Sequence, residues 1–484
     1  MPAPNLDLAA PMAEAGRLAR LPALARLRAG RAQGVAVEIV WHDTPDGRLA
    51  AAGLALSECR LGRTRVWQLA ALHAVPAATL PEVVAEAAAP DRLGRALPAP
   101  LLPVAACAGR LRTLPLAPAA GIAAVSVLEA RLRAVADEHA FCRVRLHGVA
   151  DPALARTLTE SLRLEVATDT LAVAALGVAG RPVPSPEPPR LAADQSVSAA
   201  FAALLARQAG ELLRLAPRAA LGDGMEPVHQ MRVALRRLRS AEKLFRRAVD
   251  CEALQGLKPE LRELARHLGP ARDWDVFGAG TGRAIEAAFP DDPAIARLRT
   301  AAERKRAESY AALAGYLRGP AFRALGVTLV WLAAARPWEA LPPADDAQAA
   351  ARAQPLAAFA ARALSRRLDH VLEPGADLSG LAPEELHALR IQAKRLRYAA
   401  EFFAPLYPPG PVKRFVRRVA ALQERLGALN DGTVAGGLMA ALGGAERGHA
   451  AGVVRGYVAA SHTGAARKLA RTWRRVRRLD AFWA

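Results

Sequence analysis

The chain has 484 residues, of which 52% are hydrophobic and only 5% aromatic, and its formal net charge is +20. This length exceeds what one hydrophobic core usually serves, so we expect two or three domains with cores of Ala, Leu and Val and a high helix content. The strongest apolar run, "VTLVWLAAA" at 327–335, is only half a membrane span, and the N-terminus lacks the pattern of a signal peptide. The sequence therefore predicts a cytoplasmic protein that does not engage a membrane.

Four cysteines are spread widely along the chain, with no CxxC pattern: Cys59, Cys107, Cys142 and Cys251. This spacing predicts neither a zinc site nor a disulfide framework. We expect all four to be small buried side chains.

The first part of the chain mixes strand-like and helical segments. Strands are expected at 35–44, 65–72 and 141–148, and a helix at 151–162. The stretch "VAGRPVPSPEPPR" at 178–190 then holds five prolines without apolar periodicity, as in a semi-rigid linker. We therefore expect an α+β domain at 1–177, a linker at 178–194 and a second domain at 195–484.

The second domain is predicted to be entirely helical, because apolar residues recur at i, i+3 and i+4 between breaks rich in Gly, Pro and Asp. The expected helices are 195–215, 227–249, 257–268, 273–288, 293–314, 320–335, 350–372, 383–404, 411–427, 432–442, 446–461 and 464–479.

Positive charge is concentrated in this helical part. Residues 1–195 hold 21 basic and 18 acidic residues, a net charge of +3, whereas residues 196–484 hold 45 and 28, a net charge of +17. Only six of the 66 basic residues are Lys. Although a biased composition explains much of that preference, guanidinium groups also suit phosphate oxygens.

Two basic segments repeat at a constant spacing. "VHQMRVALRRLRSAEKLF" at 228–245 and "LHALRIQAKRLRYAAEFF" at 386–403 align after a shift of 158 residues, and the same shift aligns "LARHLGPARDWDV" with "LQERLGALNDGTV". A single offset over this length indicates a duplicated helical unit.

Each basic segment places its cations on one side of a helix. At about 100° per residue, His229, Arg232, Arg236, Arg239 and Lys243 fall within an arc of roughly 80°, opposite an apolar face. His387, Arg390, Lys394 and Arg397 occupy the same arc in the second segment. A run of arginines on one helix is usually only a solvated surface. Neighbouring like charges destabilise a helix slightly, and yet this charge pattern occurs in both repeats. Its duplication therefore indicates that a bound ligand compensates the repulsion.

These residues resemble the two histidine boxes of the CHAD family, the conserved histidine α-helical domain, from about residue 195 onward. The resemblance implies two pseudo-symmetric four-helix bundles with a basic groove between them that binds inorganic polyphosphate. Carried over residue by residue, together with Lys243 from the ladder, the expected binding residues are His229, Arg232, Arg236, Arg237, Arg239, Lys243, His387, Arg390, Lys394, Arg395 and Arg397.

The N-terminal part resembles the CYTH family, the triphosphate-tunnel fold, through "WHDTPDGRLAAAGLAL" at 41–56. The resemblance implies a barrel-like tunnel whose strands carry metal-binding carboxylates. Here the opening strand reads "NLDLA", and Arg143 and Arg145 stand where a later strand should be acidic. Divalent metals require oxygen ligands, so these changes predict a degenerate domain, with Asp7 and Glu129 as the carboxylates to examine. Five arginines could still line the tunnel for an anion: Arg60, Arg110, Arg112, Arg131 and Arg133.

The leading hypothesis is a non-enzymatic protein that binds inorganic polyphosphate, with no catalytic residue, metal or cofactor, and that associates with polyphosphate granules. One alternative is a metal-dependent triphosphatase or polyphosphate hydrolase of the N-terminal tunnel. Another is a nucleic-acid-binding protein, which the charge allows but which would usually add aromatic stacking platforms. The sequence identifies no protein partner.

Overall fold

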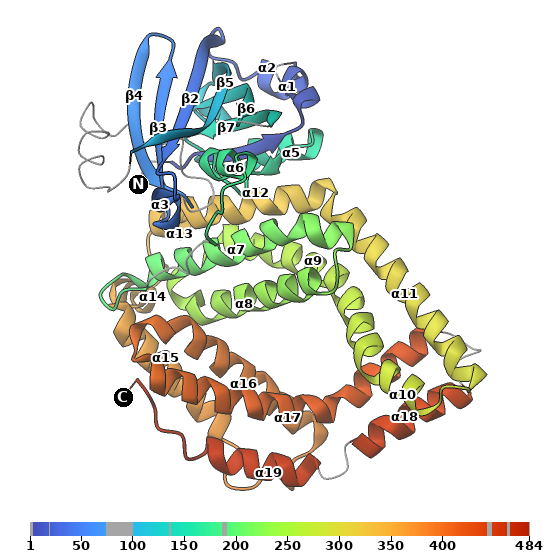
Figure 1. The fold of residues 1–484 in the computed structure, drawn as a ribbon. Helices are drawn as coiled ribbons and strands as arrows, with labels where there is room; N and C mark the ends of the chain where they lie inside the picture. Colours follow the sequence, from blue (N-terminus) through green and yellow to red (C-terminus); the bar gives the residue numbers. More distant parts are fainter. Residues whose placement is uncertain are drawn as a thin grey trace. The chain divides into compact units, whose positions relative to one another are not determined.

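The computed structural model describes residues 3–18, 20–73, 100–134, 137–185, 191–442, 448–461 and 465–483. The chain divides into two compact units, residues 1–188 with 318–337, and residues 189–317 with 338–484 (Figure 1). The first unit thus includes a segment that the linear division predicted from the sequence assigns to the second domain. Residues 186–190 of the expected linker lie outside the described residues.

The first unit is built on one antiparallel sheet of eight strands in the order β4-β3-β2-β5-β6-β7-β1-β8. The strands are β1 Leu6–Ala10, β2 Gln33–Asp43, β3 Leu54–Leu61, β4 Thr64–Ala71, β5 Leu102–Pro115, β6 Ala124–Arg133, β7 Glu138–His147 and β8 Glu165–Val166. The predicted α+β class is therefore confirmed. No pairing among the described residues joins the edge strands β4 and β8, so the sheet stays open and does not close into the expected barrel.

Short helices accompany this sheet: α1 Met12–Leu18, α2 Pro22–Ala25, α3 Arg48–Ala51, α5 Ala153–Ser161 and α6 Leu171–Val178. Alternate residues of β2, among them Val37, Ile39 and Trp41, join one core with the apolar residues of α6. This alternation follows from the two-residue period of a strand, which places successive side chains on opposite faces of the sheet. All four cysteines are free and buried, as expected.

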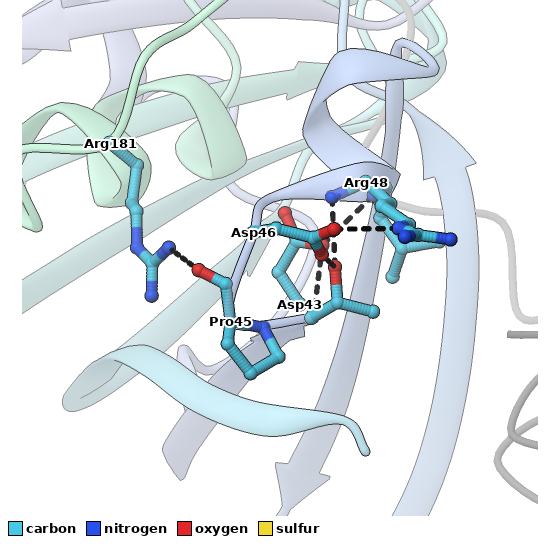
Figure 2. Close-up of polar contacts among 7 residues, drawn as sticks. Asp43, Pro45, Asp46, Arg48 and Arg181 are labelled. Atoms are coloured by element: carbon cyan, nitrogen blue, oxygen red, sulfur yellow. Dashed lines mark hydrogen bonds and ion pairs between the residues drawn. The ribbon is translucent and has the colours of Figure 1, made fainter. Parts of the chain in front are cut away.

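The turn between β2 and α3 uses its carboxylate to cap a helix (Figure 2). Asp43 is 3% exposed and accepts hydrogen bonds from the backbone N–H groups of Leu49, at 2.9 Å, and Ala50, at 3.1 Å. Arg181 donates to the carbonyl oxygen of Pro45 at 2.7 Å. This acidic segment, which carried the resemblance to the tunnel fold, is therefore occupied with holding its own loop.

Helix α12, Pro320–Ala335, belongs to the first unit although residues 189–317 separate its segment from the rest of that unit. It contacts α5, β1 and β8. Trp331 donates its indole N–H to the carbonyl oxygen of Val149 at 3.0 Å, and Arg323 donates to that of Thr159 at 2.8 Å. The apolar run seen in the sequence thus forms a buried helix. Within the described residues, no helix combines the length and the apolarity of a membrane span.

The second unit is helical throughout its described residues, with α7 and α8 side by side (Figure 1). Its α-helices are α7 Val197–Leu221, α8 Glu226–Val249, α9 Glu252–Phe277, α10 Arg283–Ala288, α11 Pro293–Leu317, α13 Pro337–Ala340, which starts at the boundary between the units, α14 Asp346–Ala353, α15 Leu356–Leu372, α16 Pro383–Phe403, α17 Pro409–Leu442, α18 His449–Ser461 and α19 Ala465–Val476. A π-helical turn at Gly278–Gly282 joins α9 to α10.

This unit contains two groups of four helices, as the fold class predicts. Helices α7, α8, α9 and α11 contact one another in a closed ring. In the second group α16 contacts both α15 and α17, and α17 contacts α19. Trp473 of α19 closes this second group by donating to the carbonyl oxygen of Gly375, which follows α15, at 3.2 Å.

The helix bounds follow the spacing of the sequence repeat. Adding 158 to the starts of α7, α8 and α9, residues 197, 226 and 252, gives 355, 384 and 410. Helices α15, α16 and α17 start at 356, 383 and 409, within one residue of those positions. The repeated basic segments therefore occupy equivalent helices of the two bundles.

Candidate polyanion-binding site

Helix α8 carries the first basic segment, and the opposite face of the helix is apolar. Met231, Leu235, Leu238 and Phe245 are each at most 3% exposed, which confirms the predicted core face. Pro227 lies in the first turn, where its missing N–H costs no helical hydrogen bond. The buried face fixes the rotation of the helix, and the basic residues are consequently directed away from the core.

Helix α16 holds the second segment in the same way. Leu389, Ala393 and Leu396 are buried, and Pro383 occupies the first turn. Glu385 accepts a hydrogen bond from the backbone N–H of Ala382 at 2.7 Å and so caps the start of the helix. Both basic helices thus begin at a defined residue just before their histidine.

The two basic helices contact each other, and an ion pair joins them. Arg237 of α8 donates to Glu401 of α16 at 2.7 Å. Arg397 lies 3.4 Å from the other carboxylate oxygen of Glu401. Glu401 therefore neutralises one expected binding residue from each segment.

Lys394 is the point at which the two basic segments converge. Burial lowers its pKa to about 8, together with the positive charges of Arg390, Arg236, Arg397 and Arg232. Two of these neighbours come from its own helix and two from α8. No carboxylate within the described residues opposes this shift, so the site holds excess positive charge before any ligand binds.

Arg232 is anchored by α9. Its Nη1 donates to the carbonyl oxygen of Gly269 at 2.9 Å and lies 3.3 Å from Asp273. Burial lowers the pKa of Arg232, and Arg236 adds to the effect. The repeat preserves part of this arrangement, because Arg390 lies beside Gly427. The side chain of Asp431, the predicted equivalent of Asp273, lies outside the described residues.

His229 lies among the same cations. Burial lowers its pKa, and the charges of Arg272, Arg236 and Arg232 lower it further. Arg272, from α9, belongs to the site although it lies outside both basic segments. It precedes Asp273, which the repeat retains as Asp431, but its own repeat position is Asn430. His387 is exposed at the start of α16.

The remaining expected residues do not join this cluster. Arg239 is exposed, and no ion pair with it is found within the described residues. Lys243 and Arg395 line a separate cavity together with Arg247, Arg362 and Arg367. Helical spacing predicted that Lys243 lies on the face of α8 opposite the core. It could not predict that α14 and α15 lie beside α8 at Lys243 and form a cavity there.

The carboxylates of the first unit are paired with arginines. Asp7 of β1 lies opposite Arg145 of β7, and the guanidinium donates to both carboxylate oxygens at 2.6 Å. Glu129 forms an ion pair with Arg112. The side chain of Arg145 is only 7% exposed, so its removal would leave Asp7 partly buried without a partner.

Most of the arginines expected to line a tunnel are also neutralised. Arg60 pairs with Glu38, and Arg131 and Arg133 both pair with Glu138. Within the described residues, no group of three or more His, Cys, Asp or Glu side chains could hold a metal ion. Most of the expected tunnel arginines therefore carry a paired charge, and the larger net positive charge belongs to residues 196–484.

Comparisons with known proteins match the helical part of the chain. A family model of the CHAD domain matches residues 203–440. A crystal structure of the CHAD domain from the plant Ricinus communis is 30% identical, with a TM-score of 0.52, and the match covers 61% of this chain and 96% of that one.

Curated relatives match a shorter part of the chain. Two uncharacterised proteins of Mycobacterium tuberculosis, from strains CDC 1551 / Oshkosh and ATCC 25618 / H37Rv, are each 32% identical over 207 residues. The match covers 39% of this chain and only 36% of each relative's length. On the domain-length match to the Ricinus structure and the family model, this chain belongs to the CHAD family.

Proposed function

We propose that this protein binds inorganic polyphosphate between α8 and α16. The observation that carries the proposal is the convergence of Lys394 with Arg232 and Arg236, three cations from two helices. Burial lowers the pKa of Lys394 to about 8, and the repulsion of these and neighbouring arginines contributes. A chain of closely spaced phosphates relieves that repulsion through charge-assisted hydrogen bonds and releases counterions on binding. Membership of the CHAD family supports the same ligand.

We propose no catalytic role for the first unit. Its candidate metal ligands, Asp7 and Glu129, are paired with Arg145 and Arg112. A metal ion would have to displace those guanidinium groups before it met two carboxylates. The unit is then a degenerate CYTH-like domain, and the protein holds polyphosphate without cleaving it. In the cytoplasm, such binding would retain the protein on polyphosphate granules.

The direct test is a pull-down against polyphosphates of graded length, with the affinity measured at several salt concentrations. We expect affinity to rise with chain length and to fall steeply between 50 and 200 mM salt, by about a thousandfold or more if six or more phosphates are contacted. The Arg236→Gln variant should weaken binding to every length and reduce the salt slope by about one. Arg236 is exposed, so this change should leave the thermal unfolding temperature unaltered.

Arg246→Gln is the matched control, since Arg246 is an exposed arginine of the same helix outside the cluster. It should bind as the unaltered protein does. An equal loss of polyphosphate affinity in both variants would mean that only net charge matters, and it would contradict a site at Arg236.

Two further assays test the alternatives. Displacement of long-chain polyphosphate by duplex DNA at equal phosphate concentration would favour a nucleic-acid ligand. Phosphate release from tripolyphosphate on addition of Mg²⁺ or Mn²⁺ would contradict the proposal that the first unit is not catalytic.

A further inference from the structure

A basic cavity lies within the helical unit, and its lining does not include the cations clustered around Lys394. Its volume is about 570 Å³, within the range of about 300 to 1,000 Å³ typical of small-molecule sites. Helices α8, α14, α15 and α16 supply its walls. Six cations line it: Lys243, Arg247, Arg362, Arg366, Arg367 and Arg395.

The charge of this cavity is uncompensated. None of its lining residues is a carboxylate, and no ion pair to the six cations is found within the described residues. Burial lowers the pKa of Arg367 to about 10, with further contributions from the charges of Arg395 and Arg366. Solvent can satisfy the exposed members, Arg362 and Arg366, whereas an anion would stabilise the half-buried guanidinium of Arg367 beside two others.

One wall of the cavity is apolar. Phe359 is partly exposed and lines the cavity, and its ring also stacks on Phe245 at a centroid distance of 5.0 Å and an interplanar angle of 29°. Leu244, Ala351 and Ala363 continue this wall. A ligand with an apolar ring can pack against this wall, which a bare phosphate chain would leave unused.

The cavity and the Lys394 cluster are separate sites. Lys394 and Arg395 are adjacent on α16 and so project about 100° apart. The cations that shift the pKa of Lys394 include no residue of the cavity lining.

We propose that this cavity binds a nucleoside polyphosphate, with its base against Phe359 and its phosphates on Arg366, Arg367 and Arg395. The two features of the lining match two parts of one ligand: the apolar wall with its aromatic ring matches the base, and the cations match several adjoining negative charges. An inorganic chain would satisfy only the second. The site is independent of the polyphosphate binding proposed above.

The test is calorimetric titration of the full chain with ATP, adenosine and tripolyphosphate in the absence of divalent metal. We expect ATP to bind, adenosine to bind far more weakly, and Arg367→Gln to weaken ATP binding by about tenfold or more. Phe359→Leu retains apolar volume but removes the ring, and should weaken ATP about two- to tenfold while leaving tripolyphosphate unchanged.

Two surface variants keep the test independent of folding. Arg247 lines the cavity and Arg246 does not, although both are exposed residues of α8. Arg247→Gln should weaken ATP binding about two- to fivefold, and Arg246→Gln should not. The proposal is overturned if ATP fails to bind, if it binds no better than tripolyphosphate and ignores the loss of the Phe359 ring, or if Arg236→Gln abolishes ATP binding while the cavity variants retain it.

Discussion

Lys394 shows how strongly the two basic helices act on a single side chain. An unperturbed Lys has a pKa near 10.4, whereas here burial and four arginines lower it to about 8. The ammonium form is thus costly in the unliganded protein and becomes favourable once phosphate oxygens approach. Ligand binding and proton uptake are therefore coupled at this residue.

The coupling predicts a pH dependence of polyphosphate binding. Above pH 8 the free protein loses the Lys394 proton, while a bound anion restores a higher pKa, so binding must take up that proton. Affinity should fall by about tenfold between pH 7 and 9 at constant ionic strength. Titrations in buffers of different ionisation enthalpy would measure the proton uptake directly.

Lys394→Arg supplies the comparison, because a guanidinium stays charged throughout this range. That variant should bind with much less pH dependence. An identical pH profile in both proteins would mean that another group titrates and would contradict the role of Lys394.

The sequence predicts which face of each helix is basic, but not which cations are free. Arg237 and Arg397 matched the family positions, yet both lie against Glu401. That carboxylate stands 158 residues after Lys243, where the first copy has a cation. The alignment of the two repeats therefore shows that a carboxylate replaces a cation at this position. Only the packing of α8 on α16 shows which arginines Glu401 neutralises.

At the level of elements, β5 and β6 approach each other too closely for a side chain at one point. A Cβ added to Gly109 would lie 2.2 Å from the carbonyl oxygen of Glu129 and 2.4 Å from the Cβ of Ala130. The first contact is with backbone and cannot be relieved by a rotamer change.

Gly109→Ala should therefore lower the free energy of unfolding of the first unit by about 1 to 3 kcal/mol, as overpacking does. Urea unfolding followed by circular dichroism measures the change. Gly16→Ala is the control, since nothing lies within 4 Å of a Cβ added there. A midpoint unaltered by Gly109→Ala would contradict the close approach of the two strands.

Helix boundaries were less predictable than helix identity. The "GP" pair at 269–270 predicted a break, yet α9 runs from Glu252 to Phe277 through Pro270. Arg232 donates to the carbonyl of Gly269 at this turn, and packing of α9 on α8 and α11 stabilises the continuous helix. Conversely, the predicted segment 350–372 is divided into α14 and α15 at Gln354, because the residue before a proline disfavours the helical conformation.

At the scale of the whole molecule, α12 shows what a linear reading cannot predict. Its apolar pattern predicts a buried helix but not the element that buries it. The helix lies within the matched CHAD region, residues 203–440, and yet it packs on α5, β1 and β8. The sequence boundary at the prolines therefore differs from the division of the folded chain.

Removal of residues 1–188 should therefore destabilise the remaining chain. A fragment of residues 189–484 would leave the contact face of α12, with Trp331 and Arg323, without partners. We expect it to bind a dye for exposed apolar surface and to aggregate at concentrations at which the full chain stays monodisperse. Light scattering and dye fluorescence measure both effects. A fragment with the dispersity and dye binding of the full chain would contradict the assignment of α12 to the first unit.

The position of α12 also orders events on the ribosome. Domains generally fold as they emerge, N-terminal first. Here the sheet is complete by residue 166, but α12, which packs on α5, β1 and β8, is not complete until residue 335, after all of α7, α8, α9 and α11. The N-terminal unit therefore cannot complete its fold until the helices of the first bundle have been synthesised and α12 has emerged.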